Sequence, residues 1–141
     1  MTVRKIKRAY SVSEIQSLYI PKLPFENEWE AAFGQPGKTG TWLIWGQSGN
    51  GKSSFVIQLA KYLCKFAKVA YNSLEESTGL SLQKSLILHN MQEVSRRFLI
   101  LDRESMEDLS IRLNKKRSPD IVIIDSFQYS GLTYALSLIH I

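Results

Sequence analysis

Short apolar runs alternate along the chain with segments in which apolar residues recur every three or four positions. Four runs are typical of strands and lie at residues 41–45, 68–74, 97–102 and 121–125. Helical spacing marks the segments between them, at residues 51–66, 81–91 and 105–113. Strands that alternate with helices build a parallel sheet with covering helices, so we expect an α/β fold with a mainly parallel sheet.

The first strand candidate is the bulkiest of the four. Residues 41–45 read Thr-Trp-Leu-Ile-Trp and lead directly into Gly46. A continuous apolar run of this kind suits a strand that is buried on both faces. We therefore expect Trp42 and Trp45 to belong to the core rather than to form a platform for a ligand ring.

Residues 1–38 have a different pattern and are interpreted as an accessory segment. Ser11 or Ser13 can cap a short helix, which Pro21 and Pro24 would end, and residues 28–33 offer further helical turns. The change of pattern places the core domain at residues 39–135.

Length and composition limit the class of protein. A chain of 141 residues has room for one domain with a core, and no run approaches the roughly 18 apolar residues of a membrane span. We expect a cytoplasmic protein without a membrane partner. Cys64 is the only cysteine, which excludes an internal disulfide and favours a buried position on a helix face.

The net charge of +5 comes partly from two short basic clusters, at residues 4–8 and 115–117. Such clusters are usually solvated, although a polyanion such as DNA would also suit them. Aromatic residues are not visibly interleaved with either cluster, and motifs that read a DNA groove are absent from the sequence. The charge alone therefore leaves both interpretations open.

The most specific motif joins the first strand to the first long helix. It matches G-x-x-x-x-G-K-[ST] and consists of Gly46, Gln47, Ser48, Gly49, Asn50, Gly51, Lys52 and Ser53. Glycines let such a loop wrap closely around a phosphate, while backbone amides and the helix dipole attract its charge. We expect residues 46–54, Ser54 included, to bind ATP, with Lys52 on the β- and γ-phosphates. The Ser53 hydroxyl would be a ligand of Mg²⁺.

Asp125 ends four apolar residues, which is the Walker B pattern. A carboxylate at the end of a strand beside the phosphate-binding loop faces the same crevice and can hold Mg²⁺ through a bound water. Asp125 is therefore, after Ser53, the second residue predicted to bind Mg²⁺. Asp102 also ends a strand, and it could lie near the site or serve as a structural cap.

Two further segments resemble RecA-like ATPases, especially the RadA and DnaB-helicase branch. They are Tyr-Asn-Ser-Leu-Glu-Glu-Ser at residues 71–77 and Ile-Asp-Ser-Phe-Gln at residues 124–128. The resemblance spans roughly residues 34–129 and implies a three-layer P-loop NTPase core. It also implies that Glu75, or failing it Glu76, polarises the attacking water, which makes Glu75 and Lys52 the predicted catalytic residues. Gln128 could sense the γ-phosphate or cap a turn.

The resemblance implies an ATPase of DNA recombination, repair or replication that acts as a homo-oligomer on single- or double-stranded DNA. A nucleotide-dependent switch with little hydrolysis of its own is the alternative. A small-molecule kinase shares the same loop, but it would need a lid and an acceptor pocket that are not identifiable in this sequence.

The end of the chain departs from the family pattern. RecA-like cores continue past the Walker B strand, and nothing after Gly131 convincingly supplies the later strand that lies beside the P-loop strand. Residues 136–141 follow without a turn or cap. We interpret them as a non-native tail translated from a sequencing adapter, which would leave the core incomplete at its C-terminus. A genuine short apolar strand is the alternative.

Overall fold

The computed structural model describes residues 3–46, 51–74, 79–126 and 137–140. The chain divides into two compact units, Met1–Lys38 and Thr39–Ile141. The predicted residues Gln47, Ser48, Gly49, Asn50, Glu75, Glu76 and Gln128 lie outside the described residues.

The first unit contains two short helices. Helix α1 (Val12–Gln16) begins with a capping box, in which Ser11 and Glu14 each bond the backbone of the other. Helix α2 (Asn27–Phe33) ends at Gly34, whose φ of 68° lies in the left-handed region that glycine adopts without strain. An isolated bridge between Lys22 and Gly37 joins the two ends of the segment that carries α2.

The second unit is built on a sheet of five strands in the order β1-β5-β4-β2-β3. The strands are β1 (Thr41–Ile44), β2 (Val69–Ser73), β3 (Phe98–Asp102), β4 (Ile121–Asp125) and β5 (Ser137–His140). Strand β2 pairs in parallel with β3 and β4, while β5 runs antiparallel to both β1 and β4. Four strands therefore share one direction, and their carboxyl ends meet at one edge of the sheet.

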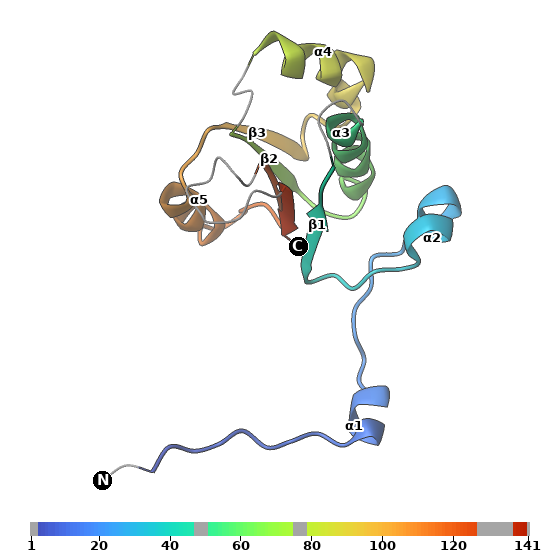
Figure 1. Cartoon of the computed structure of the whole chain (residues 1–141), viewed down its shortest axis with the longest axis vertical. Helices are drawn as coiled ribbons and strands as arrows, with labels where there is room; N and C mark the ends of the chain where they lie inside the picture. Colours follow the sequence, from blue (N-terminus) through green and yellow to red (C-terminus); the bar gives the residue numbers. More distant parts are fainter. Residues whose placement is uncertain (1–2, 47–50, 75–78, 127–136, 141) are drawn as a thin grey trace. The chain divides into compact units, whose positions relative to one another are not determined.

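The helices of this unit are α3 (Lys52–Leu63), α4 (Leu80–Leu88) and α5 (Met106–Leu113), with a short 3₁₀ helix η1 (Met91–Val94) after α4. Right-handed crossovers place α3 and α4 on one face of the sheet and α5 on the other, and Figure 1 shows α3 and α5 on different sides of the strands. The layers are therefore helix, sheet and helix.

The core lies on both faces of the central strands. On the α5 face, apolar side chains form one cluster: Ala70, Leu74, Leu101, Leu109, Val122 and Ile124. On the α3 face, the alternate strand residues Val69, Tyr71, Ile121 and Ile123 are buried, as are five residues of α3. Strands β2 and β4 are buried at every position, which explains the apolar run of β4 and the apolar first half of β2.

The first strand forms where it was predicted, but the prediction that both of its faces are buried was wrong. Strand β1 lies at one end of the strand order, and its side chains alternate between exposed and partly buried. Leu43 is 42% exposed and Trp45 is 72% exposed, so Trp45 is not a core residue. A strand with a single neighbour cannot be covered as completely as β2 or β4.

The C-terminal segment also differs from expectation. Residues 137–140 form β5 between β1 and β4, so a strand after Gly131 does lie beside β1. This corresponds to the alternative interpretation of the segment, a short strand. Pairing of this kind uses main-chain groups and depends little on sequence; the non-native origin of the segment stays a prediction.

Candidate functional site

The candidate site lies at the edge where the parallel strands end, here called the carboxyl edge. Strand β1 leads through Trp45 to Gly46, and helix α3 begins at Lys52. Strands β2 and β4 end at the same edge with Ser73 and Asp125, which are paired in register. Ligands of open α/β sheets bind at such an edge.

The start of α3 has the local geometry that its sequence favours. Gly51 precedes the helix with a φ of 74°, a left-handed conformation that costs other residues free energy. Lys52 is the first helical residue and is partly buried, whereas Ser53 is exposed. Because glycine has no side chain, Gly51 cannot cap the first amides of α3 as serine or aspartate would. Those amides and the helix dipole are suited to an anion.

Asp125 is the buried acid of the carboxyl edge. It is 8% exposed, and its Oδ2 accepts a hydrogen bond from the hydroxyl of Tyr71 on the neighbouring strand β2. The backbone carbonyl of Asp125 accepts from the amide of Leu74 at 2.8 Å, which extends the pairing of the two strands. A carboxylate can accept about four hydrogen bonds, so Tyr71 leaves acceptor capacity for water around a metal ion.

A row of polar side chains crosses the three parallel strands. Ser73 is paired with Asp102 of β3 on one side and with Asp125 of β4 on the other. Residues in register on parallel strands share a face, and for this row it is the face of α3. Ser73 is 2% exposed, whereas Asp102 is exposed at the end of its strand. The row therefore runs from solvent at β3 toward the buried acid at β4.

The side chain of Asn72 lies on the α5 face of the sheet and binds the backbone of the turn after β3. Its side-chain amide donates to the carbonyl of Glu104 at 2.9 Å, and its oxygen accepts from the Glu104 amide at 3.0 Å. The Glu104 carboxylate in turn binds the guanidinium of Arg112 on α5, with contacts of 2.8–3.0 Å. Together these bonds fix the turn from β3 into α5 at the carboxyl edge.

Ser54, which we predicted to contact the nucleotide, has a partner within the protein. Its hydroxyl lies 3.1 Å from Nε2 of His89, the residue that ends α4. Lys61 adds a bond of 3.0 Å to the His89 carbonyl and an ion pair of 3.0 Å with Glu93. These contacts hold the outer side of α3 against α4 and η1.

The structure thus places five of the predicted site residues at one edge of the sheet. Gly46, Gly51, Lys52, Ser53 and Asp125 belong to the carboxyl edge through the common direction of β1 and β4. Tyr71 was not predicted as a site residue. Its signal in the sequence is an aromatic side chain with a hydroxyl, two residues before Ser73 at the end of the strand.

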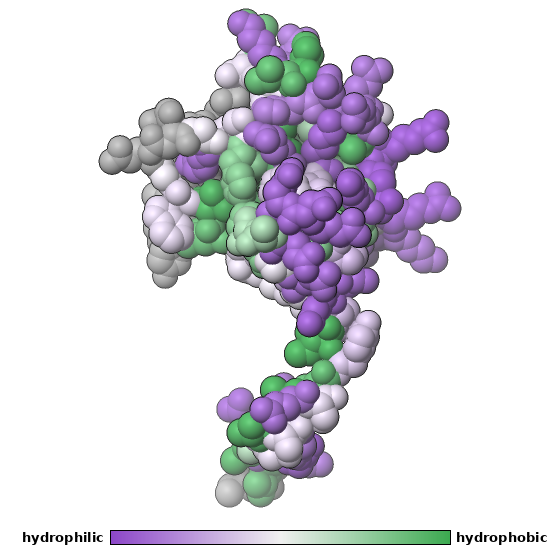
Figure 2. Space-filling view, turned by 90° about the vertical axis from the view of Figure 1, so that its right-hand side faces the viewer, coloured by the Kyte–Doolittle hydropathy of each residue, from purple (hydrophilic) through white to green (hydrophobic). Residues whose placement is uncertain are grey.

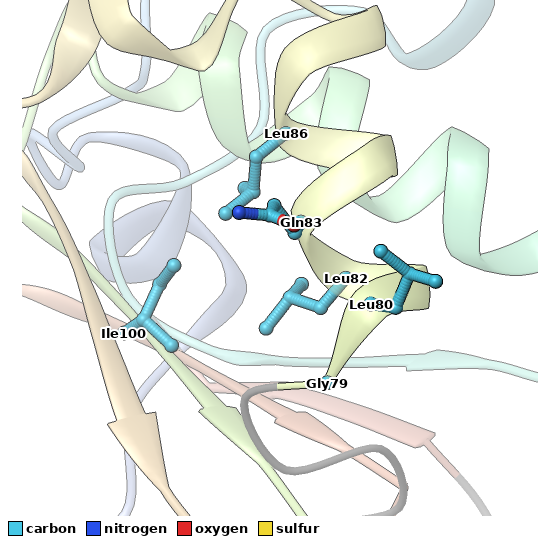
Figure 3. Close-up of a pocket in the computed structure, with 6 residues that line it drawn as sticks. All are labelled: Gly79, Leu80, Leu82, Gln83, Leu86 and Ile100. Carbon is cyan, nitrogen blue, oxygen red and sulfur yellow. The ribbon is translucent and has the colours of Figure 1, made fainter.

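An apolar pocket of about 470 Å³ lies between α4 and β3 (Figure 3). It is lined by Gly79, Leu80, Leu82, Gln83, Leu86 and Ile100. Among the described residues, none of those predicted to hold phosphate or magnesium lines it. The described part of the chain also has no cluster of three or more His, Cys, Asp or Glu side chains. Mg²⁺ in nucleotide sites needs only one or two protein ligands beside phosphate oxygens and water, so Ser53 and Asp125 suit it.

Comparisons with known proteins identify no relative. No family model matches the chain, and no match was found among curated proteins or solved structures. None of the described helices is long and apolar enough to cross a bilayer.

Proposed function

We propose that this chain binds Mg²⁺-ATP at the carboxyl edge of its sheet and hydrolyses it. One observation carries the proposal: the motif of residues 46–53 connects the end of a strand to the start of a helix, with Gly51 in the left-handed conformation. A glycine-rich sequence at that junction is what phosphate binding by backbone amides requires. The buried Asp125 at the same edge adds a second, independent element of the site.

The roles of the residues follow from their charge and place. The Lys52 ammonium, at the first turn of α3, would contact the β- and γ-phosphate oxygens, and the Ser53 hydroxyl would be a ligand of Mg²⁺. Asp125 would hold a water of the same ion, oriented by the hydrogen bond from Tyr71. Bound Mg²⁺ would neutralise the negative charge that develops on the phosphate oxygens.

Hydrolysis, the DNA partner and oligomer formation rest on the resemblance to RecA-like ATPases. In this proposal Glu75 positions and polarises the attacking water, and Glu76 is the second candidate. The biological setting would be DNA recombination, repair or replication.

Nucleotide binding is tested by Lys52→Ala, with Lys84→Ala on the exposed surface of α4 as the matched control. Loss of a charged hydrogen bond should weaken binding of a fluorescent ATP analogue by about 10- to 100-fold, whereas the control should bind like the wild type. Equal affinities in the two variants would remove the proposed phosphate site.

Steady-state hydrolysis with and without single-stranded DNA separates the proposed ATPase from a nucleotide-dependent switch. Stimulation by DNA supports the ATPase. Tight ATP binding without turnover under either condition would instead favour the switch.

A further inference from the structure

The opposite edge of the sheet, where the parallel strands begin, is here called the amino edge. Strands β2, β3 and β4 start there in register, with Val69 paired to both Phe98 and Ile121. The three segments that enter these strands are far apart in sequence. The sheet brings them side by side at a spacing of about 4.8 Å per strand.

Each of these three segments carries basic residues. The set, here called the basic edge, comprises Lys65, Lys68, Arg96, Arg97, Lys115, Lys116 and Arg117. All are exposed except Lys68, which is partly buried. Within the described ranges none of the seven forms an ion pair. The Lys68 ammonium bonds a backbone carbonyl, and that of Lys65 lies 5.2 Å from the centre of the Tyr62 ring. The charges of the other five residues are therefore available to an external partner.

Hydrogen bonds hold the three segments together. The Lys68 ammonium donates to the carbonyl of Arg117 at 2.9 Å, and the amide of Val69 donates to the carbonyl of Arg97 at 2.8 Å. The Lys68 carbonyl accepts from the amide of Asp120 at 2.8 Å, while the Lys68 amide donates to the Asp120 carboxylate at 3.1 Å. The Asp120 carboxylate is thus bonded to a backbone amide. The hydrogen bonds hold the three backbone segments that carry the cations in fixed positions.

Clustered cations repel one another, so a surface of this kind costs stability unless an anion offsets it. Figure 2 shows hydrophilic side chains gathered over much of the visible face of the second unit. The segments of the basic edge contain no exposed large apolar side chain, since Phe66 is partly buried and Ala67 and Pro119 are buried. Protein partners usually need an apolar or aromatic centre, whereas a phosphodiester backbone needs mainly Lys and Arg.

We propose that the basic edge binds the phosphodiester backbone of a nucleic acid without sequence preference. The choice of nucleic acid as the partner rests on the proposed function. The position of the binding surface is inferred from the three basic segments that meet at the amino edge. It places nucleic acid on the side of the sheet opposite the proposed ATP site. Either ligand can therefore bind without competing for the same residues.

The test compares two variants that each remove three positive charges. Lys115→Gln/Lys116→Gln/Arg117→Gln changes the basic edge, and Arg4→Gln/Lys5→Gln/Lys7→Gln changes the other basic cluster of the chain. Glutamine keeps the side chains long and polar, and Arg117, which has a φ of 60°, is replaced by another residue with a Cβ. Binding of labelled single-stranded and duplex oligonucleotides is measured by fluorescence anisotropy over a range of salt concentrations.

The basic-edge variant should bind about tenfold more weakly than the wild type, and the slope of log K against log salt should fall by about 2–3. The loss should be equal for oligonucleotides of different sequence and smaller in the control variant. Equal losses in both variants would show a general effect of net charge and overturn the proposal, as would unchanged binding in both.

Arg96→Gln/Arg97→Gln provides a second variant at the same surface, with the same expected direction, should the triple variant not fold. Vesicles of phosphatidylcholine with phosphatidylserine are the competing polyanion. If the basic edge binds them but not oligonucleotides, the surface belongs to a membrane and the proposal fails. ATP binding by these variants should equal that of the wild type, so failure of the ATP proposal is detected separately through Lys52→Ala.

Discussion

The two edges of the same sheet are built on different physical principles. At the carboxyl edge, two buried polar side chains have defined partners: Asp125 is bonded to Tyr71, and Asn72 to the backbone of Glu104. At the amino edge, basic groups are many and mostly exposed, and hydrogen bonds fix the backbone that carries them. Buried polar groups depend on geometry, because each lost bond leaves an unsatisfied atom. Exposed charges act through their sum and are screened by salt.

The largest effect is expected at the carboxyl edge, on the rate of hydrolysis. Glu75→Gln should slow turnover by about 100-fold or more, because a positioned carboxylate contributes on that order to proton transfer, while ATP binding stays unchanged. Single-turnover kinetics and binding of the fluorescent ATP analogue measure the two quantities. Glu76→Gln is the matched control. Normal turnover in the Glu75 variant together with a slow Glu76 variant would transfer the role to Glu76.

A second effect of the carboxyl edge concerns folding. Asn72→Ala should lower the free energy of unfolding by about 2–4 kcal/mol, because the amide and carbonyl of Glu104 both lose a partner beside a fully buried side chain. Denaturant titration gives the value. Asn114→Ala, which removes a single exposed bond of 2.9 Å to the Ser110 carbonyl, should change stability by less than about 0.5 kcal/mol. Comparable losses in both would contradict a special role for the buried bonds.

Tyr71→Phe removes one hydroxyl from the same edge and isolates the bond to Asp125. A decrease of about 1–3 kcal/mol in the free energy of unfolding is expected, since the buried side chain of Asp125 loses a hydrogen-bond donor. The triple variant of the basic edge should lie within about 0.5 kcal/mol of the wild type. This contrast in stability would disappear if the exposed cations were structurally as important as the buried phenol.

The smallest effect is a pH dependence near the amino edge. Burial raises the pKa of Cys64 to about 11, an effect that the nearby Arg97 partly opposes. The folded protein therefore holds the thiol proton more tightly than the unfolded chain does. The resulting stability is complete below 9.0, the ordinary pKa of a cysteine thiol, and is lost as the pH rises toward the folded value of about 11.

Comparison of the wild type with Cys64→Ala isolates this contribution from other groups that titrate at alkaline pH. The difference in unfolding free energy between the two proteins should shrink by about 1 kcal/mol on going from neutral pH to about pH 10. A difference that does not vary with pH would mean that the thiol titrates alike in the folded and unfolded states.

The central strands were predictable because their sequences are unambiguous. The apolar runs at 68–74, 97–102 and 121–125 became Val69–Ser73, Phe98–Asp102 and Ile121–Asp125. The helix predicted at 105–113 became α5 (Met106–Leu113), and the Ser105 side chain caps it by accepting from the amide of Asp108 at 3.1 Å. Local pattern and capping chemistry decide these elements.

Other features depend on which strands become neighbours, and the sequence pattern does not contain this information. The exposure of Trp45 follows from the terminal place of β1, and β5 enters between β1 and β4 although its residues lack flanking turn signals. Tyr71 and Asp125 are 54 positions apart, and Asn72 and Glu104 are 32 apart. The motif of residues 46–53 could be found in the sequence because its residues are consecutive, whereas the partner of Asp125 and the segments of the basic edge come from distant parts of the chain.

Strand β1 is held in the sheet by its pairing with β5, the last strand of the described residues. Among the strands of the described residues, β5 is the only neighbour of β1, and four residue pairs from Thr41–His140 to Ile44–Ser137 join them. The strand that leads into the glycine-rich motif is thus joined to the other strands of the sheet through the four residues of β5. Truncation just before Ser137 would leave the amides and carbonyls of β1 without that partner, and the entrance to α3 would lose its support from the sheet.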